Sequence, residues 1–514
     1  MLTSIVRFSL KFKGIIIALA CLLLAYGIYE LTNAKYDVFP QFAPARVKIQ
    51  TEAPGLSPKQ VELLITQPIE EAVNGTVGVR TLMSNSIQGI SIVKITFKSG
   101  TDIYLDRQLV AERLSEIAGR LPAGAQPPVI TPLTSSLSVI MAIGLTSDSL
   151  SLMQLRTAAD WTLKPGLLAV PGVAKVVTFG GGVKQLQVQV KPALLFKYGL
   201  SINDVIDAAK KATGVEGAGF IDTRNQRINI QTEGQSLTPS ELGDAVVLKK
   251  NGAVVLLKDV AKVVVAPAPS IGAAQVMGKI GIIMQISDQF GANTLVVTRR
   301  VDKALNELIP TLQAEGVIVH RNAFRASDFI DAAVHDIGTS LLLGGILVVF
   351  VLLLFLFNFR TAAISLTVIP LSLLTAVIVL QFLGYGLNTM TLGGLAIAIG
   401  EVVDDAVIDV ENILRRLREN KLSANQRPLL RVVLDASIEV RSAVVYATFA
   451  VILVFLPVLT MTGLAGRLFS PLALAYIFAI LASLLFALTV TPAMCLLLLG
   501  RSHVIDAEPR LTAV

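Results

Sequence analysis

The sequence predicts an α-helical membrane bundle of six transmembrane helices, with a large periplasmic α+β domain between the first and second helices. The 514-residue chain is 53% hydrophobic, with a mean hydropathy of +0.68, and only 16% of its residues are charged. An average soluble domain contains roughly 25% charged residues. The apolar residues gather in runs close to the ~20 residues that a membrane-spanning helix needs. Composition and run length together therefore indicate a membrane protein.

The apolar runs are distributed unevenly along the chain. The first covers residues 14–31, and about 300 residues of mixed sequence separate it from the others. The other five cover residues 337–357, 362–382, 392–413, 442–461 and 472–499. Basic residues precede the first run, as they do in a signal peptide, but no small-residue cleavage site follows it. We therefore expect a retained anchor, with a cleaved signal peptide as the alternative.

Basic residues in the short loops predict the orientation of the bundle. They lie before the first run, at Arg360 between the second and third runs, and in a cluster after the fourth run. The cluster consists of Arg415, Arg416, Arg418, Lys421, Arg427 and Arg431. Because basic loops remain in the cytoplasm, six spans place both termini there and the large domain in the periplasm. Residues 423–441 carry apolar residues at helical spacing, which predicts an amphipathic helix on the cytoplasmic surface of the inner membrane.

The chain is expected to divide into five parts. Residues 1–33 form the first helix with its cytoplasmic N-terminus, and residues 336–500 form the other five helices. Residues 34–135 and 136–335 form two periplasmic repeats, the second with an insertion at about 216–265, and residues 501–514 form a cytoplasmic tail. In both repeats a helical stretch leads into a turn and alternating strands, at 70–97 and 167–190, which fits a ferredoxin-like β-α-β-β-α pattern.

Local patterns predict further features of this domain. Amphipathic helices are expected at 106–121 and 201–212, the second opening with Ser201 and Asp204 as a capping box. The three glycines at 180–182 are predicted to form a hairpin turn. They do not fit a phosphate-binding loop, because no Gly-Lys-Ser or Gly-Lys-Thr completes one.

The fourth apolar run contains a group of acidic residues in the segment GEVVDDAVIDVENI at 400–413. Its five carboxylates are Glu401, Asp404, Asp405, Asp409 and Glu411. On a helix they lie on sides that also carry Gly393, Gly394, Ala396, Ala398 and Gly400, and small residues let helices approach closely. The remaining face is expected to contact lipid. Its residues are Leu395, Ile399, Val402, Val403, Ala406 and Val410.

The cost of these acids indicates a function. An acid near the middle of a membrane helix costs about 2.5–3.5 kcal/mol, whereas a Leu, Ile or Val recovers only about 0.3–0.6 kcal/mol. We therefore expect Asp404 and Asp405 to line the protein interior and to carry protons. Glu401, Asp409 and Glu411 either support this relay or cap the cytoplasmic end of the bundle beside Arg415 and Arg416.

Other functional classes find little support in the sequence. No Ser/His/Asp arrangement, HExxH motif or phosphate loop indicates an enzyme or a cofactor. The net charge of +7 comes from residues beside apolar runs, so it does not indicate nucleic acid binding. His320, His335 and His503 lack ligand spacing, so no metal site is predicted. Four methionines are expected in protein cores rather than as copper ligands: Met83, Met141, Met277 and Met284.

The acidic segment GEVVDDAVIDVEN resembles the fourth-span motif of the resistance-nodulation-division (RND) efflux transporters. Further similar segments follow in order around the same topology. They are TEAPGLSPKQVE and QPIEEAV within 51–73, FGGGVKQLQVQVKPALLFKYGLS at 179–201, KDVAKV at 258–263, GANT at 291–294, SDFIDAAV at 327–334, LFNFRTAAI at 356–364 and TPAMCLLLL at 491–499. TEAPGLSP and GGVKQLQVQV are more similar to the heavy-metal-efflux branch than to the drug-efflux branch.

The resemblance implies a proton antiporter that exports heavy-metal cations, with Asp404 and Asp405 as the proton relay. It also implies a trimer that works with a periplasmic adaptor and an outer-membrane channel, and it makes the 216–265 insertion a docking element. Family members usually have twelve spans in two halves, whereas this chain resembles the N-terminal half. A complementary C-terminal-type half is therefore expected to supply a lysine partner for the aspartates and two more porter subdomains.

Some features depart from the family pattern and leave alternatives open. Glu401 stands at a commonly apolar position, Ala398 stands where some metal exporters carry another acid, and Lys191 replaces an Asp common before Pro192. The alternatives are an exporter of drugs or organic compounds, a protein-export accessory similar to SecD and SecF, and an inactive truncated half.

Overall fold

The computed structural model forms two compact units. It describes residues 2–37, 39–40, 45–98, 100–117, 119–122, 124–134, 139–214, 220–229, 235–250, 253–269, 272–356, 359–423 and 425–499. One unit comprises Met1–Ile140, Ser287–Arg299 and Arg325–Val514, and the other comprises Met141–Ile286 and Arg300–Phe324. The predicted tail at 501–514, with His503, lies outside the described residues.

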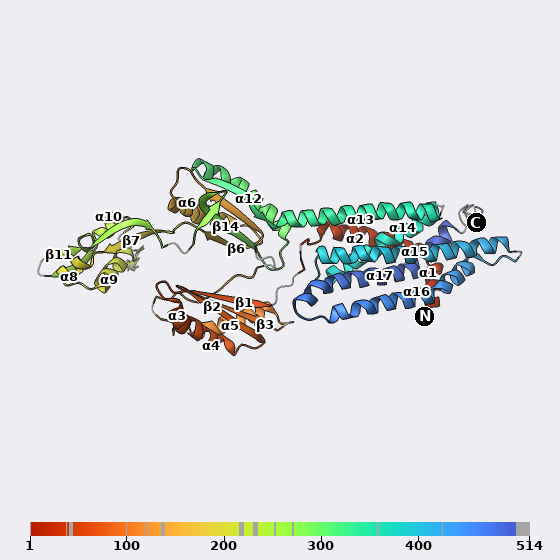
Figure 1. Cartoon of the computed structure of the whole chain (residues 1–514), viewed down its shortest axis with the longest axis horizontal. Coiled ribbons are helices and arrows are strands. Elements are labelled where there is room, and N and C mark those ends of the chain that lie inside the picture. The colour runs from red at the N-terminus through yellow and green to blue at the C-terminus, as the bar shows by residue number, and fades with distance from the viewer. Residues whose placement is uncertain are drawn as a thin grey trace. The chain divides into compact units, whose positions relative to one another are not determined.

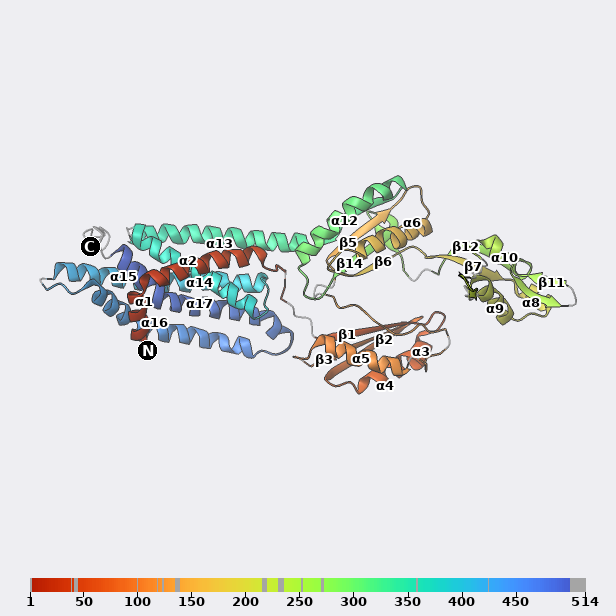
Figure 2. The same ribbon diagram turned by 180° about the vertical axis from the view of Figure 1, so that it is seen from behind.

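A bundle of long helices forms most of the first unit (Figures 1 and 2). Its helices are α1 (Leu2–Lys11), α2 (Lys13–Asn33), α13 (Ala326–Leu356), α14 (Phe359–Phe382), α15 (Thr389–Leu422), α16 (Leu429–Thr460) and α17 (Gly463–Leu498). Helix α17 packs against α14, α15, α16, α1 and α2, and it buries a series of alanines that allow close approach. Within the described residues, five helices are long and apolar enough to cross a membrane: α2, α13, α14, α16 and α17.

Helix α16 corrects the prediction of a separate amphipathic helix at 423–441. It begins at Leu429, directly after Pro428, and continues without a break to Thr460. No Gly or Pro occurs between Leu429 and Leu456 to end the helix. Val432, Val433, Leu434 and Ala436 of its first turns pack into the bundle core, whereas Leu430 is exposed. Helix α1, which the sequence patterns did not predict, buries Val6 and Leu10 in the same core.

The first unit also contains a four-stranded sheet. Its elements are β1 (Arg46–Glu52), α3 (Pro58–Val61), the π-helix η1 (Glu62–Thr66), α4 (Gln67–Asn74), β2 (Val79–Ile87), β3 (Ile90–Phe97), α5 (Ile103–Ile117) and β4 (Val129–Ile130). The strands lie in the order β2-β3-β1-β4, with antiparallel neighbours. Alternate residues of β1 and β3 pack against α4 and α5, which cover one face of the sheet (Figure 1).

A second sheet repeats this order of elements. Its elements are β5 (Met141–Thr146), α6 (Leu152–Ala158), the π-helix η2 (Ala159–Leu163), α7 (Lys164–Leu168), β6 (Val173–Phe179), β13 (Ala274–Val276), β14 (Lys279–Asp288), α12 (Thr294–Ala314) and β15 (Ile318–Arg325). Strand β14 pairs with β5, β6 and β13, and β15 lies beside β5. Both repeats start their first helix with a Ser-x-x-Gln capping box, at Ser57/Gln60 and Ser151/Gln154, followed by a π-helical turn. These shared features strengthen the evidence for an internal repeat.

A long segment is inserted between β6 and β14. It contains β7 (Lys184–Val190), α8 (Pro192–Tyr198), α9 (Ile202–Thr213), β8 (Phe220–Asp222), β9 (Arg227–Asn229), α10 (Pro239–Gly243), β10 (Val246–Lys250), β11 (Ala253–Leu256), α11 (Leu257–Val260) and β12 (Ala261–Pro267). Strand β7 pairs along its whole length with β12, and β6 pairs with β14. The insertion therefore starts near residue 180 rather than 216. The capping box of Ser201 and Asp204 at the start of α9 is confirmed.

The three glycines at 180–182 are not a hairpin turn, because the strands on either side of them pair with other strands. They carry the chain out of the second sheet through a crowded space. Gly180 has a φ of +83°, and a Cβ there would lie 2.7 Å from the main-chain oxygen of Gly281. A Cβ at Gly182 would lie 2.5 Å from the Pro267 Cβ. Glycine is needed here for its small size and for its left-handed conformation.

Candidate functional site

Helix α15 carries all five predicted acids. The helix begins after Asn388, whose side-chain oxygen accepts hydrogen bonds from the backbone N–H groups of Met390 (3.0 Å) and Thr391 (3.1 Å). This cap satisfies donors at the helix N-terminus that have no partner inside the helix. The helix then continues through the acidic segment to Leu422 without interruption.

The structure separates the five acids into a buried group and an exposed group. Asp405 is 8% exposed and Asp409 is 1% exposed. Glu401 is partly buried, whereas Asp404 and Glu411 are exposed on the side of the helix that carries Ala396 and Gly400. Neighbouring residues on a helix point about 100° apart. The side chains of Asp404 and Asp405 therefore point in different directions in the described structure, the first exposed and the second buried.

Asp405 faces α17 inside the bundle. Its Oδ2 accepts a hydrogen bond from the Ser483 hydroxyl at 3.5 Å, which is at the long limit for such a bond. One residue further along α15, the main-chain oxygen of Ala406 accepts a hydrogen bond from the Ser365 hydroxyl of α14 at 3.3 Å. The carboxyl group therefore lies in the interior between three helices with one weak polar contact.

Asp409 forms an ion pair with Arg441 of α16. The Arg441 Nη2 donates to the Asp409 Oδ2 at 2.5 Å and to the main-chain oxygen of Ala487 in α17 at 2.8 Å. Both charged side chains are 1% exposed. The alternative that Asp409 caps the bundle beside Arg415 and Arg416 is therefore wrong. Arg415 instead donates to Asn412 at 2.8 Å, and Arg416 pairs with Glu439 and Glu419.

The sequence patterns did not single out Arg441. Residues 429–441 also contain Arg431, Asp435 and Glu439, and the apolar run begins only at 442, so no signal in the sequence distinguishes Arg441. Its partner follows only from the packing of α15 against α16. The sequence-based helix faces also need correction. Leu395, Val402, Ala406 and Val410, which were expected to contact lipid, are buried at 5% exposure or less.

Among the described residues, no group of three or more His, Cys, Asp or Glu side chains could hold a metal ion. Met141 and Met284 lie in the core, as predicted, but Met83 and Met277 are 65% and 82% exposed. His320 forms a hydrogen bond of 2.9 Å with the Thr146 hydroxyl.

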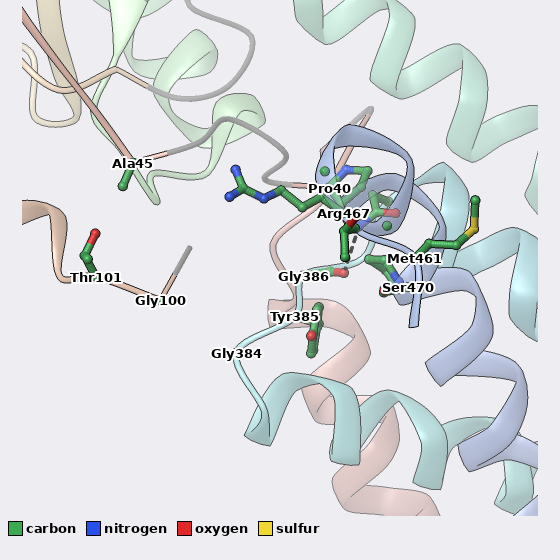
Figure 3. A pocket seen from close by; sticks show the side chains of 15 residues that line it. Pro40, Ala45, Gly100, Thr101, Gly384, Tyr385, Gly386, Met461, Arg467 and Ser470 are labelled. Atoms are coloured by element: carbon green, nitrogen blue, oxygen red, sulfur yellow. Dashed lines mark hydrogen bonds between the residues drawn. The ribbon is translucent and has the colours of Figure 1, made fainter. Parts of the chain in front are cut away.

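A pocket of about 630 Å³ lies at the end of the bundle where α14 joins α15 and α16 joins α17 (Figure 3). Its lining includes Gly384, Tyr385, Met461, Arg467 and Ser470. Arg467 is the one charged side chain among the described residues of this lining.

The chain is similar over nearly its whole length to known transport proteins. Residues 5–511 match the model of the AcrB/AcrD/AcrF family. The chain is 35% identical to protein HelA of Legionella pneumophila, covering 99% of this chain and 49% of that protein. It is 30% identical to the cobalt-zinc-cadmium resistance protein CzcA of Cupriavidus metallidurans, with the same two coverages.

A solved structure shows the same fold. The chain superimposes on a crystal structure of a heavy metal efflux pump with a TM-score of 0.82 and 30% sequence identity, covering 95% of this chain and 48% of that one. The chain thus spans about half the length of the relatives that it matches. Its sequence match, its fold and its fourth-span motif agree, and the chain belongs to the AcrB/AcrD/AcrF family of RND transporters.

Proposed function

We propose that this chain is one half of a proton-driven RND exporter of heavy-metal cations. The observation that carries the proposal is the buried acid cluster on α15, in which Asp405 lies inside the bundle one helical turn from the ion pair of Asp409 and Arg441. Relatives of this chain include CzcA and the cation efflux system protein CusA of Escherichia coli, which is 32% identical over 96% of this chain. Their names favour cations over drugs as the substrate.

The energy for export comes from protons that move inward through the bundle. Each proton supplies about 2.3 kcal/mol per 100 mV of membrane potential, in addition to any pH difference. Asp404 and Asp405 take up and release these protons, and Glu401 and Glu411 assist at either side of them. A carboxyl group inside a helical bundle suits this role, because burial makes its neutral form accessible.

The proposed topology has six spans. Helix α15 packs against α13, α14, α16 and α17, so it crosses the inner membrane with them despite its acids. Both termini are then cytoplasmic. The two β-α-β-β-α-β repeats are ferredoxin-like periplasmic porter subdomains, and the insertion between β6 and β14 is the docking element.

The exposed face of α15 receives the complementary half of the transporter. This face combines the small residues Ala396 and Gly400 with the exposed acids Asp404 and Glu411. Small residues permit close helix contact, and an acid at such a contact needs a partner of opposite charge. A second half, in a trimer with a periplasmic adaptor and an outer-membrane channel, completes both the relay and the substrate pathway.

The test is growth of the native host, with any complementary half present, on zinc, cobalt, nickel, cadmium, copper and silver salts and on a panel of drugs. Strains carry the wild-type chain, a deletion, or Asp405→Asn. The proposal expects deletion and Asp405→Asn to cause sensitivity to at least one metal, with the variant protein present in the membrane. Sensitivity to drugs alone, a protein-secretion defect, or unchanged growth would contradict it.

A further inference from the structure

The buried acids of α15 lie in two polar layers, one helical turn apart. Asp405 and Asp409 are four residues apart on α15, and Ser483 and Ala487 are four residues apart on α17, so each pair shares a helix face. The first layer contains Asp405 and Ser483. The second contains Asp409, the main-chain oxygen of Ala487, and Arg441, which enters from α16.

The ion pair in the second layer leaves part of its bonding capacity unused. Arg441 uses Nη2 for Asp409, for Ala487 and for a longer contact of 3.4 Å with the Ser437 hydroxyl. Its Nε and Nη1, and the Oδ1 of Asp409, are buried without a hydrogen-bond partner among the described residues. A guanidinium has five N–H donors in a rigid fork. Two of its three nitrogens are therefore available to another acceptor.

Asp405 is the nearest other buried acid on the same face of α15. Its contact with Ser483 is weak, and no other buried cation lies among the described residues of the bundle. A buried ion pair that serves only stability normally satisfies its remaining donors and acceptors, since unpaired ones are costly. In this pair, by contrast, the Asp409 Oδ1 and the Arg441 Nε and Nη1 have no hydrogen-bond partner among the described residues.

We infer that Arg441 is a positioning residue whose guanidinium is the shared counter-ion of Asp405 and Asp409. The inference rests on the proposed proton relay. Arg441 stays on Asp409 while Asp405 carries a proton. When the Asp405 O–H bond breaks and the proton passes to water, the free Nε–H and Nη1–H groups turn to the new carboxylate. The ion pair thereby sets how readily Asp405 exchanges its proton.

This role predicts that a single and a double variant of the ion pair shift the pH profile of transport in opposite directions. Asp409→Asn leaves Arg441 to Asp405 alone, which favours the carboxylate, so the pH profile of transport moves lower. Replacing both partners, in Asp409→Asn/Arg441→Gln, removes the counter-ion without leaving an unpaired charge, so the profile moves higher. The other titratable groups around the cluster are Glu401 on α15 and Tyr476 and Cys495 on α17. All three are unchanged in these variants.

The experiment uses everted membrane vesicles that contain the chain with its complementary half. Proton release is measured from pH 5.5 to 8.5 after adding Zn²⁺, Co²⁺, Cd²⁺ or Cu⁺ alone. We expect shifts of about one pH unit in opposite directions, a tenfold change in proton affinity each way. Arg441→Lys keeps the charge and is the matched control, with a profile close to wild type.

Unshifted profiles, or shifts in the same direction, in variants present at wild-type levels would overturn the inference and leave a purely structural ion pair. If the double variant fails to insert, Asp409→Asn alone decides, because an unshifted or raised profile for it also overturns the inference. Metal-stimulated proton release that persists in Asp405→Asn would instead refute the underlying relay. The two failures are therefore distinguishable.

Discussion

Gly394 of α15 lies directly against the main-chain oxygen of Leu472 in α17: a Cβ on Gly394 would fall 2.3 Å from that oxygen and 3.1 Å from the Ala475 Cβ. Backbone atoms cannot yield as a flexible side chain does. The contact therefore fixes the distance between the helix that carries the acids and the central helix of the bundle.

We predict that Gly394→Ala weakens the packing of α15 on α17 and destabilises the bundle. Overpacking of this kind costs about 1–3 kcal/mol. The measurement is thermal unfolding of the purified chain in detergent, together with its level in the membrane. Gly393→Ala is the matched control, because a Cβ at Gly393 meets nothing within 4 Å. Equal stability of the two variants would show that α15 and α17 can move apart without loss of free energy of unfolding.

Asp404→Asn should leave the chain itself intact but abolish export. Asp404 is exposed in the described structure, so its replacement by an amide of the same size disturbs no packing inside this chain. The predicted result is an unchanged unfolding temperature for the chain, with loss of metal resistance when the complementary half is present. Resistance at the wild-type level would remove Asp404 from the proposed relay while leaving Asp405 as its centre.

Asp106 should make the first sheet less stable as the pH rises. This residue of α5 is 3% exposed, and its Oδ2 accepts a hydrogen bond of 2.7 Å from the Thr101 hydroxyl. Burial raises the pKa of the Asp106 carboxyl above its ordinary value of 3.8, while the Thr101 hydrogen bond opposes the shift. The folded state therefore holds the proton more tightly, and stability is lost as the pH rises from about 3.8 through the folded-state pKa.

The corresponding test compares the unfolding temperatures of wild type and Asp106→Asn between pH 3.5 and 8. The neutral amide avoids the cost of a buried charge, so the variant should gain stability relative to wild type as the pH rises. The difference should be smallest at pH 3.5, where both folded and unfolded wild type are largely protonated. A difference that is constant across this range would contradict the burial effect on Asp106.

Arg156 should be needed where the chain leaves β6 for the insertion. Its Nη1 donates to the main-chain oxygen of Gly180 at 2.8 Å, and its Nε pairs with Asp160 at 2.6 Å, with both side chains no more than 20% exposed. Arg156→Ala leaves the Asp160 Oδ2 and the Gly180 carbonyl without this donor, while Thr178 still donates to the Asp160 Oδ1, and we expect the loss to cost about 1–3 kcal/mol. Arg113→Ala is a suitable control, because the pair of Arg113 and Glu116 is exposed and contributes at most about 1 kcal/mol.

The positions of the long helices could be predicted from the sequence, because a run of about 20 apolar residues has few alternatives in a membrane. The side of each helix that is buried could not be predicted in the same way. Val402, Ala406 and Val410 look equally suited to lipid or to a protein interior, since both are apolar. Only the packing of α15 among four neighbours shows that these residues face protein.

The pairing of strands was predictable only where partners are close in sequence. β2 and β3 are joined by two residues, and their alternation indicates a hairpin. The partner of β6 is β14, about 100 residues later, and nothing in the local alternation of β6 distinguishes that strand from the adjacent β7. Asp405 was identified because its charge conflicts with the apolar residues around it in the sequence. Arg441 owes its importance to Asp409 on the preceding helix α15, and only the packing of the two helices shows that pair.

The exit and return of the insertion touch one another: the backbone N–H of Ala268 donates to the main-chain oxygen of Val183 at 2.7 Å. A segment whose two ends are adjacent can be replaced without changing the distance between the two points at which it joins the rest of the domain. Residues 184–268 therefore form an insertion whose two ends are adjacent in space. A different sequence at this position would leave the pairing of β6 with β14 and the helix bundle unchanged.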